Sequence, residues 1–177
     1  MTTVSTHERE RWRVTDEIQR VADLADWSGW VPFTQAVIQA PQTPGVYLAR
    51  RGYGGTLVYV GKSGERRGMG IRGRLIIYSQ GQAAVSGLGE AALDRALADR
   101  AWLLTRLAEV DSCRPRRTTS WAREAIRWTD LHLCWHSTES EAAATRLERE
   151  VLSRLGNYPL WNRRRGVRDG QLRATAD

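Results

Sequence analysis

Lysine is almost absent from this chain. Lys62 is the only lysine among 27 basic residues, and the other 26 are arginines. Arginine does not easily replace a compact ammonium group that can lose its proton. The one lysine that remains is therefore a candidate functional residue.

Cysteine and long apolar runs are scarce as well. Cys113 and Cys134 lie 21 positions apart, which fits neither a disulfide framework nor a zinc site. No apolar run approaches the length of a membrane-spanning helix, and the N-terminus lacks an apolar signal region. These absences predict a soluble, cytoplasmic protein with no membrane partner.

What the sequence does have is positive charge. The net charge is +7 and the isoelectric point is about 10.2. Because phosphate groups attract clustered guanidinium groups, a nucleic acid is the expected partner. A length of 177 residues is enough for one independent domain.

Apolar periodicity predicts the order of the elements. A charged segment at 5–25 carries apolar residues at helical spacing. Thr138-x-x-Glu141 is a capping-box pattern that opens a helix ending near Leu155. The order predicts an α+β fold, with strands at 45–49, 56–60 and 131–136 and further helices at 71–80, 90–110 and 120–128.

Four short motifs then follow one another along the chain. Each is weak evidence alone, but the ordered set resembles the GIY-YIG nuclease superfamily over residues 43–80 and 129–163, about half of the chain. The motifs are Gly45-Val46-Tyr47, then Tyr59-Val60-Gly61 at the expected spacing, then Arg74 with Tyr78, and finally a helix with Glu148 before Pro159-x-x-Asn162.

The resemblance implies a fold, a cofactor and a partner. It implies a three-stranded, mainly antiparallel sheet flanked by helices, in a nuclease domain at 41–165 with a helical insertion at 81–128. Residues 1–40 would form an N-terminal helical extension, and 166–177 a flexible tail. The implied activity is hydrolysis of phosphodiester bonds in DNA with Mg²⁺ or Mn²⁺, and no small-molecule cofactor. The nearest kinds are excision-repair nuclease domains and small restriction enzymes, and a short chain favours restriction or another defence role.

Tyr47 and Tyr59 lie on adjacent strands of the expected hairpin, so both phenols can reach one face. A tyrosine titrates near pH 10 and is a poor base unless a cation stabilises its phenolate. Lys62 is placed to supply that charge or to orient the attacking water. The family assigns one such tyrosine as general base, and the sequence leaves open which of the two it is.

Arg74 and Tyr78 are four residues apart and therefore neighbours on one helix face. A guanidinium group there can hold a phosphate with two hydrogen bonds and stabilise the charge that grows during displacement. Arg72 is the competing choice. The resemblance favours Arg74, because in the family a tyrosine or histidine follows the arginine by four residues, and this leaves Arg72 as a nucleic-acid contact.

The metal ligand is a choice between two glutamates. Glu148 shares a helix face with apolar residues, where a carboxylate is costly unless it is paired or binds a cation. Mg²⁺ suits one carboxylate plus water and phosphate oxygens. Glu150 remains the alternative. Counting back twelve residues from Asn162, as the resemblance suggests, reaches Glu150, so choosing Glu148 implies two extra residues before Pro159.

The remaining candidates lie near the C-terminus and in the insertion. Asn162 is expected to order the site or to touch the scissile strand. Basic runs beside a nuclease site are expected to follow the phosphates of DNA, and they consist of Arg114, Arg116 and Arg117 in the insertion and Arg163, Arg164 and Arg165 after Asn162.

Two other classes of function stay open at this stage. One is a catalytically inactive module that keeps the GIY-YIG fold and only binds nucleic acid. The other is a structural subunit whose basic surface docks an acidic protein; strongly salt-dependent binding to DNA would count against it.

Overall fold

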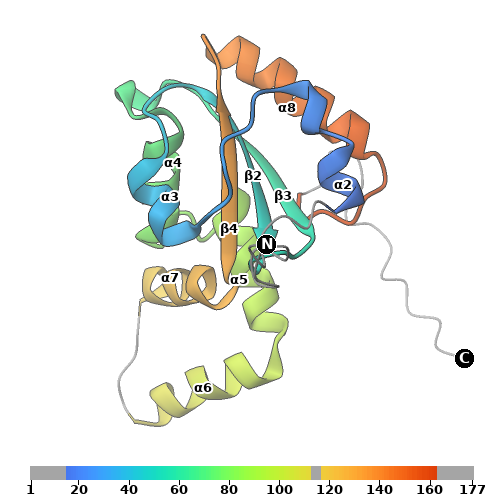
Figure 1. The fold of residues 1–177 in the computed structure, drawn as a ribbon. Helices are drawn as coiled ribbons and strands as arrows, with labels where there is room; N and C mark the ends of the chain where they lie inside the picture. Colours follow the sequence, from blue (N-terminus) through green and yellow to red (C-terminus); the bar gives the residue numbers. More distant parts are fainter. Residues whose placement is uncertain (1–14, 113–116, 163–177) are drawn as a thin grey trace, which may run out of the picture.

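A computed structural model describes residues 15–112 and 117–162 of the chain, and within them one antiparallel sheet forms the centre (Figure 1). Its four strands lie in the order β1-β4-β2-β3, so β1 and β3 are the edges. The strands are β1 (Val31–Pro32), β2 (Gly45–Arg51), β3 (Leu57–Ser63) and β4 (Leu131–Ser137). The fold is α+β, as predicted.

The predicted count of three strands is wrong, because the structure adds β1. Its two residues, Val31 and Pro32, pair with Leu133 and His132 of β4. A strand of two residues shows no alternation in sequence, and a proline fits only at an edge. The segment that we expected to be a purely helical extension thus also supplies a strand of the sheet.

The predicted hairpin is confirmed, and both of its strands end later than predicted, at Arg51 and Ser63. β2 and β3 pair antiparallel, with Tyr47 opposite Gly61 and Ala49 opposite Tyr59. The register shifts between Ala49 and Arg50. Such a bulge bends an edge strand and changes the direction of its side chains.

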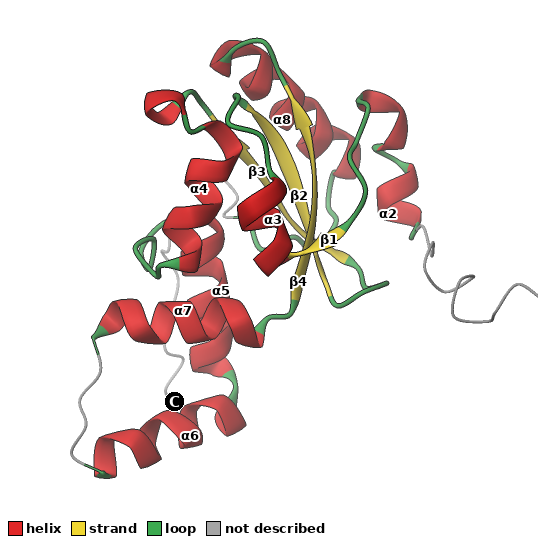
Figure 2. Ribbon diagram, turned by 60° about the vertical axis from the view of Figure 1, so that its left-hand side comes forward, coloured by secondary structure: helices red, strands yellow, loops and turns green. Residues whose placement is uncertain are grey.

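Helices cover both faces of the sheet and bury a core on each side (Figures 1 and 2). On one face the core includes side chains of α3 (Phe33–Gln39), α4 (Gly70–Ser79), α5 (Gly87–Ala98) and α7 (Thr118–Trp128). On the other face, α8 (Glu141–Leu155) and Val21 pack against Val46, Leu48 and Val60.

Two predicted long helices are broken. The helix expected at 5–25 is a single turn, α2 (Asp16–Gln19), followed by a 3-10 turn (Ala22–Leu24), and residues before 15 lie outside the described part. The helix expected at 90–110 ends at Ala98, and α6 (Arg100–Asp111) begins anew after Asp99. The Asp99 side chain accepts a hydrogen bond from the Trp102 backbone N–H, which caps α6.

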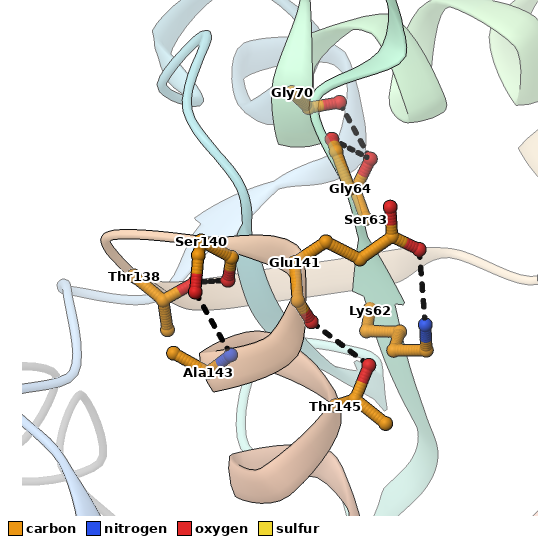
Figure 3. Close-up of polar contacts among 9 residues, drawn as sticks. All are labelled: Lys62, Ser63, Gly64, Gly70, Thr138, Ser140, Glu141, Ala143 and Thr145. Atoms are coloured by element: carbon orange, nitrogen blue, oxygen red, sulfur yellow. Dashed lines mark hydrogen bonds and ion pairs between the residues drawn. The ribbon is translucent and has the colours of Figure 1, made fainter.

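The cap of α8 also differs from the prediction. The helix begins at Glu141, and Ser140 rather than Thr138 is its N-cap, because the Ser140 hydroxyl accepts from the Ala143 N–H at 3.2 Å (Figure 3). The Thr138 hydroxyl donates to the Ser140 carbonyl instead. The capping role expected of Glu141 is therefore wrong, and its carboxylate extends toward Lys62 on β3.

Among the helices of the described segments, none is both long enough and apolar enough to cross a membrane.

Candidate active site

A cavity of about 350 Å³ opens at the β3 edge of the sheet. It lies between α4 on one face and α8 on the other, and it brings together most of the side chains that the motifs single out. Six of the seven predicted catalytic residues line it: Tyr47, Tyr59, Lys62, Arg74, Tyr78 and Glu148. Ser63, Gly64 and Glu141 complete the lining.

Gly61 lets Tyr47 reach this cavity. Tyr47 lies on β2, one strand in from the edge, and its ring lies against Gly61 of β3. A Cβ atom at Gly61 would overlap the ring and hydroxyl of Tyr47. The glycine of the second tripeptide is therefore required by the close approach of a neighbouring side chain.

The phenols of Tyr47 and Tyr78 form a buried hydrogen-bonded pair, with their oxygens 3.0 Å apart. The Tyr78 oxygen also accepts from Arg74 Nε at 2.7 Å and from the Leu88 backbone N–H at 3.3 Å. Because that oxygen already accepts two hydrogen bonds, its own hydrogen is best directed to Tyr47. The chain Arg74–Tyr78–Tyr47 then runs from a cation to a phenol that is only 1% exposed.

Tyr59 is stacked beside Tyr47, with ring centroids 6.3 Å apart, and is 9% exposed. Burial raises the pKa of Tyr47 well above its usual value, and the neighbouring Tyr78 adds to the shift. Burial likewise raises the pKa of Tyr59, helped by Tyr78 and Glu148 and opposed by Arg74. Both phenols are therefore neutral at ordinary pH, so each keeps a hydroxyl hydrogen that it can donate.

The cation that acts on these phenols is Arg74, which lowers the pKa of both against the larger effect of burial. Lys62 lies opposite Val46 in the sheet register, on the face that packs against α8. Its ammonium group is 3.5 Å from the Glu141 carboxylate (Figure 3). Lys62 nevertheless lines the same cavity as the phenols, and both roles predicted for it, stabilising a phenolate and orienting the attacking water, stay predictions.

The structure separates the two candidate glutamates. Glu148 is half-buried and lines the cavity, whereas Glu150 is exposed and lines neither cavity described here. Within 15–112 and 117–162, no group of three or more His, Cys, Asp or Glu residues gathers as a metal site. Mg²⁺ usually keeps several waters and binds one or two carboxylates plus substrate phosphates. Of the two carboxylates that line the cavity, Glu148 is the half-buried one, and it fits such an ion.

Asn162 does not line the main cavity. Its side-chain amide donates to the Val60 carbonyl at 2.6 Å and accepts from the Val60 N–H at 3.0 Å. The Trp161 N–H donates to the Val58 carbonyl, so the C-terminal segment continues along the open edge of β3. Of the two roles predicted for Asn162, ordering the site fits these bonds, since Val60 lies between Tyr59 and Gly61.

Sequence reasoning missed the N-terminus of α5. The helix was expected to begin at residue 90, but Gly87 begins α5 and lies against the Tyr78 and Tyr59 hydroxyls and Arg74. Leu88 then donates its N–H to Tyr78. The available signal was Ser86 just before an alanine- and leucine-rich run, which is a typical helix start.

Few of the predicted DNA-contacting arginines can be placed. Arg72 is half-buried, and its Nε donates to the Ala40 carbonyl at 2.7 Å, which holds α4 against the end of α3. Arg117 is exposed at the N-cap of α7. Five others lie outside the described residues: Arg114, Arg116, Arg163, Arg164 and Arg165.

Comparisons of the chain with protein-family models, curated proteins and solved structures gave no significant match. The resemblance to GIY-YIG nucleases therefore rests on the motifs, and a function has to be argued from the cavity.

Proposed function

We propose that this chain is a metal-dependent endonuclease of the GIY-YIG type that hydrolyses phosphodiester bonds in DNA. The observation that carries the proposal is the composition of the cavity. Two tyrosines, an arginine with its partner tyrosine, a lysine and a glutamate come from four elements and line one space of about 350 Å³. A net charge of +7 suits a polyanionic substrate.

Glu148 would hold the divalent ion, Mg²⁺ or Mn²⁺. When bound, such an ion stabilises negative charge on phosphate oxygens and makes a coordinated water more acidic. Glu148 is suited to this role because it is half-buried on α8 and faces the phenols across the cavity.

Arg74 and Tyr59 would bind the scissile phosphate. The Nε of Arg74 is engaged by Tyr78 at 2.7 Å, which fixes the guanidinium plane before a substrate arrives. The remaining N–H groups of Arg74 and the neutral hydroxyl of Tyr59 are donors that can meet the charge growing on phosphate oxygens.

Proton transfer from the attacking water would pass through Tyr59 rather than Tyr47. Tyr47 is 1% exposed and its hydroxyl is engaged by Tyr78, whereas Tyr59 lines both cavities. Because burial raises the pKa of Tyr59 and keeps the phenol neutral, Tyr59 would relay the proton: its own hydroxyl proton would pass to a phosphate oxygen as it accepts one from the water. Lys62, on the α8 side, would orient the water.

The test uses supercoiled plasmid DNA with purified protein and Mg²⁺. We expect nicking that is lost in Glu148→Gln and retained in the matched control Glu150→Gln, two residues away and outside the cavity. If the wild-type protein binds plasmid but never nicks it under these conditions, the chain is a binding module and the proposal is wrong.

The same preparation separates the third class of function. A scaffold that docks an acidic protein would bind DNA weakly, and its affinity for a duplex would change little with salt. A DNA enzyme loses affinity steeply as salt rises, because each phosphate contact releases counterions.

A further inference from the structure

A second cavity, of about 200 Å³, adjoins the first at Tyr59. The ring of Tyr59 lines both spaces, so whatever occupies the second cavity is next to the group in the first. Its other walls come from α5 and from the segment that Asn162 pins to β3.

One wall of the second cavity is formed by the guanidinium group of Arg95, stacked on the indole ring of Trp161. The Arg95 guanidinium lies 4.6 Å from the centre of the Trp161 ring, and Arg95 Nη1 donates to the Ala91 carbonyl at 3.0 Å. The guanidinium is thus held on one side by an indole and along its edge by the helix. A held guanidinium plane is a surface on which nucleobases stack.

The α5 wall also carries negative charge. Glu90 and Asp94 are four residues apart on α5, hence on one helix face, and both line the cavity. Carboxylates repel the phosphates of a nucleic acid but accept hydrogen bonds from the amino groups of bases. The second cavity is therefore suited to a base and unsuited to a second phosphate.

We infer that this second cavity binds a nucleobase next to the scissile phosphate, stacked on Arg95 and read through its exocyclic amino group by Asp94 and Glu90. A base within a duplex is not free to enter such a cavity, because it is stacked and paired. The inference rests on the proposed function and names its substrate class: DNA with an unpaired adenine, cytosine or guanine at the cleavage site.

Binding without metal ion tests the inference separately from cleavage. Fluorescein-labelled duplexes of one sequence, either fully paired or with one bulged adenine, cytosine or thymine, are titrated with protein in EDTA and followed by anisotropy. Stacking of one base predicts about tenfold tighter binding of the adenine and cytosine bulges than of the paired duplex. The thymine bulge, which has no amino group, should gain less.

Variants assign the preference to the cavity. Arg95→Ala should abolish the preference for bulged over paired DNA, and Asp94→Ala, which removes the acceptor at an exposed position, should remove the advantage of adenine and cytosine over thymine. Asp111→Ala, at an exposed carboxylate that lines neither cavity, is the matched control and should change neither ratio. Because the paired and bulged duplexes are compared on the same variant, the change in net charge affects both affinities alike and leaves their ratio unchanged.

Equal affinity of the wild type for paired and bulged duplexes would overturn the inference, as would a bulge preference that survives Arg95→Ala. The proposed function fails by a different result, which is the absence of cleavage of every one of these DNAs with Mg²⁺.

Discussion

At the scale of single residues, each basic group that lines the cavity contacts a polar side chain of the cavity wall. Arg74 is bonded to Tyr78, and Lys62 is paired with Glu141 on the opposite wall. The basic groups of the cavity are thus positioned by its own phenols and carboxylates. Each pairing fixes a donor group in place before a phosphate enters.

The Lys62 pairing gives a first prediction. Lys62→Arg should lower plasmid nicking about tenfold or more and leave DNA affinity nearly unchanged, because a guanidinium keeps the charge but not the compact, acidic ammonium. Nicking rates and anisotropy titrations on the same preparation measure the two effects.

Glu141→Gln serves as the control for that variant. It removes the partner of Lys62 at a mostly exposed site, so the free energy of unfolding should change by less than about 1 kcal/mol. Wild-type nicking by Lys62→Arg would remove the lysine from the mechanism.

The second prediction concerns the buried phenol of Tyr47. Its pKa in the folded chain lies well above 10, whereas an unfolded tyrosine ionises near that value, so the folded state holds its proton longer. The stability that depends on this proton is fully present below about pH 10 and is lost as pH rises further, by up to about 1.4 kcal/mol per pH unit. Urea unfolding at a series of alkaline pH values measures the slope.

Tyr47→Phe should reduce that alkaline slope, and the raised pKa of Tyr59 should account for part of the slope that remains. At neutral pH the variant should be less stable by about 1 kcal/mol, because the hydrogen bond to Tyr78 is lost. A slope identical to that of the wild type would mean that Tyr47 ionises as easily in the folded chain as in the unfolded one.

At the scale of elements, the site depends on how α5 meets α4. Gly87 has φ of +60°, and a Cβ atom there would lie 2.6 Å from the Tyr78 hydroxyl and 2.7 Å from Arg74 Nη2. Gly87→Ala should therefore displace the start of α5, break the Leu88–Tyr78 bond and reduce nicking about tenfold, with about 1–2 kcal/mol lost from stability.

Gly54→Ala provides the comparison for that third prediction. Gly54 lies in the loop between β2 and β3, where an added Cβ has no heavy atom within 4 Å. Wild-type nicking and stability are expected there. Equal effects of the two alanine variants would show that the docking of α5 does not matter for the site.

The sequence predicted the parts of the site that local patterns encode. Tyr47, Tyr59 and Arg74 could be singled out because their short motifs resemble those of the family. Glu148 could be chosen because it also lies on an apolar helix face. The docking of Gly87 against the phenols could not be predicted, because it depends on how α5 packs in space. The break at Asp99 was hidden for a related reason, since the helical periodicity is good on both sides of it.

At the scale of the whole molecule, the sheet carries a second polar cluster away from the cavity. Arg50 and His132 are paired across β2 and β4, and both are buried. The Arg50 guanidinium lies 4.5 Å from the centre of the Trp30 ring, and the His132 ring meets Tyr53 edge-on. This cluster joins the hairpin, β4 and the segment before β1, so its charge state affects the stability of the sheet.

The fourth prediction follows from the pKa of His132, which burial lowers and Arg50 lowers further, against the opposing effect of Asp130. The unfolded chain binds a proton near pH 6.5, where the folded chain does not, so stability must fall as pH drops below that value. The decrease should reach up to about 1.4 kcal/mol per pH unit, and urea unfolding between about pH 8 and pH 5 measures it.

His132→Gln should remove that acid dependence, and His136→Gln, on the same strand but partly exposed, is the matched control. If the wild type and His132→Gln lose stability in parallel between those two pH values, some other group is responsible.

The placement of Glu148 on the last described helix has a consequence for synthesis. Tyr47, Tyr59, Arg74 and Tyr78 leave the ribosome early, but the carboxylate that completes the cavity follows about seventy residues after Tyr78. The edge of β3 is covered later still, when the segment around Asn162 arrives. If the cavity is a nuclease site, a nascent chain cannot cut nucleic acid until α8 and the segment around Asn162 have left the ribosome.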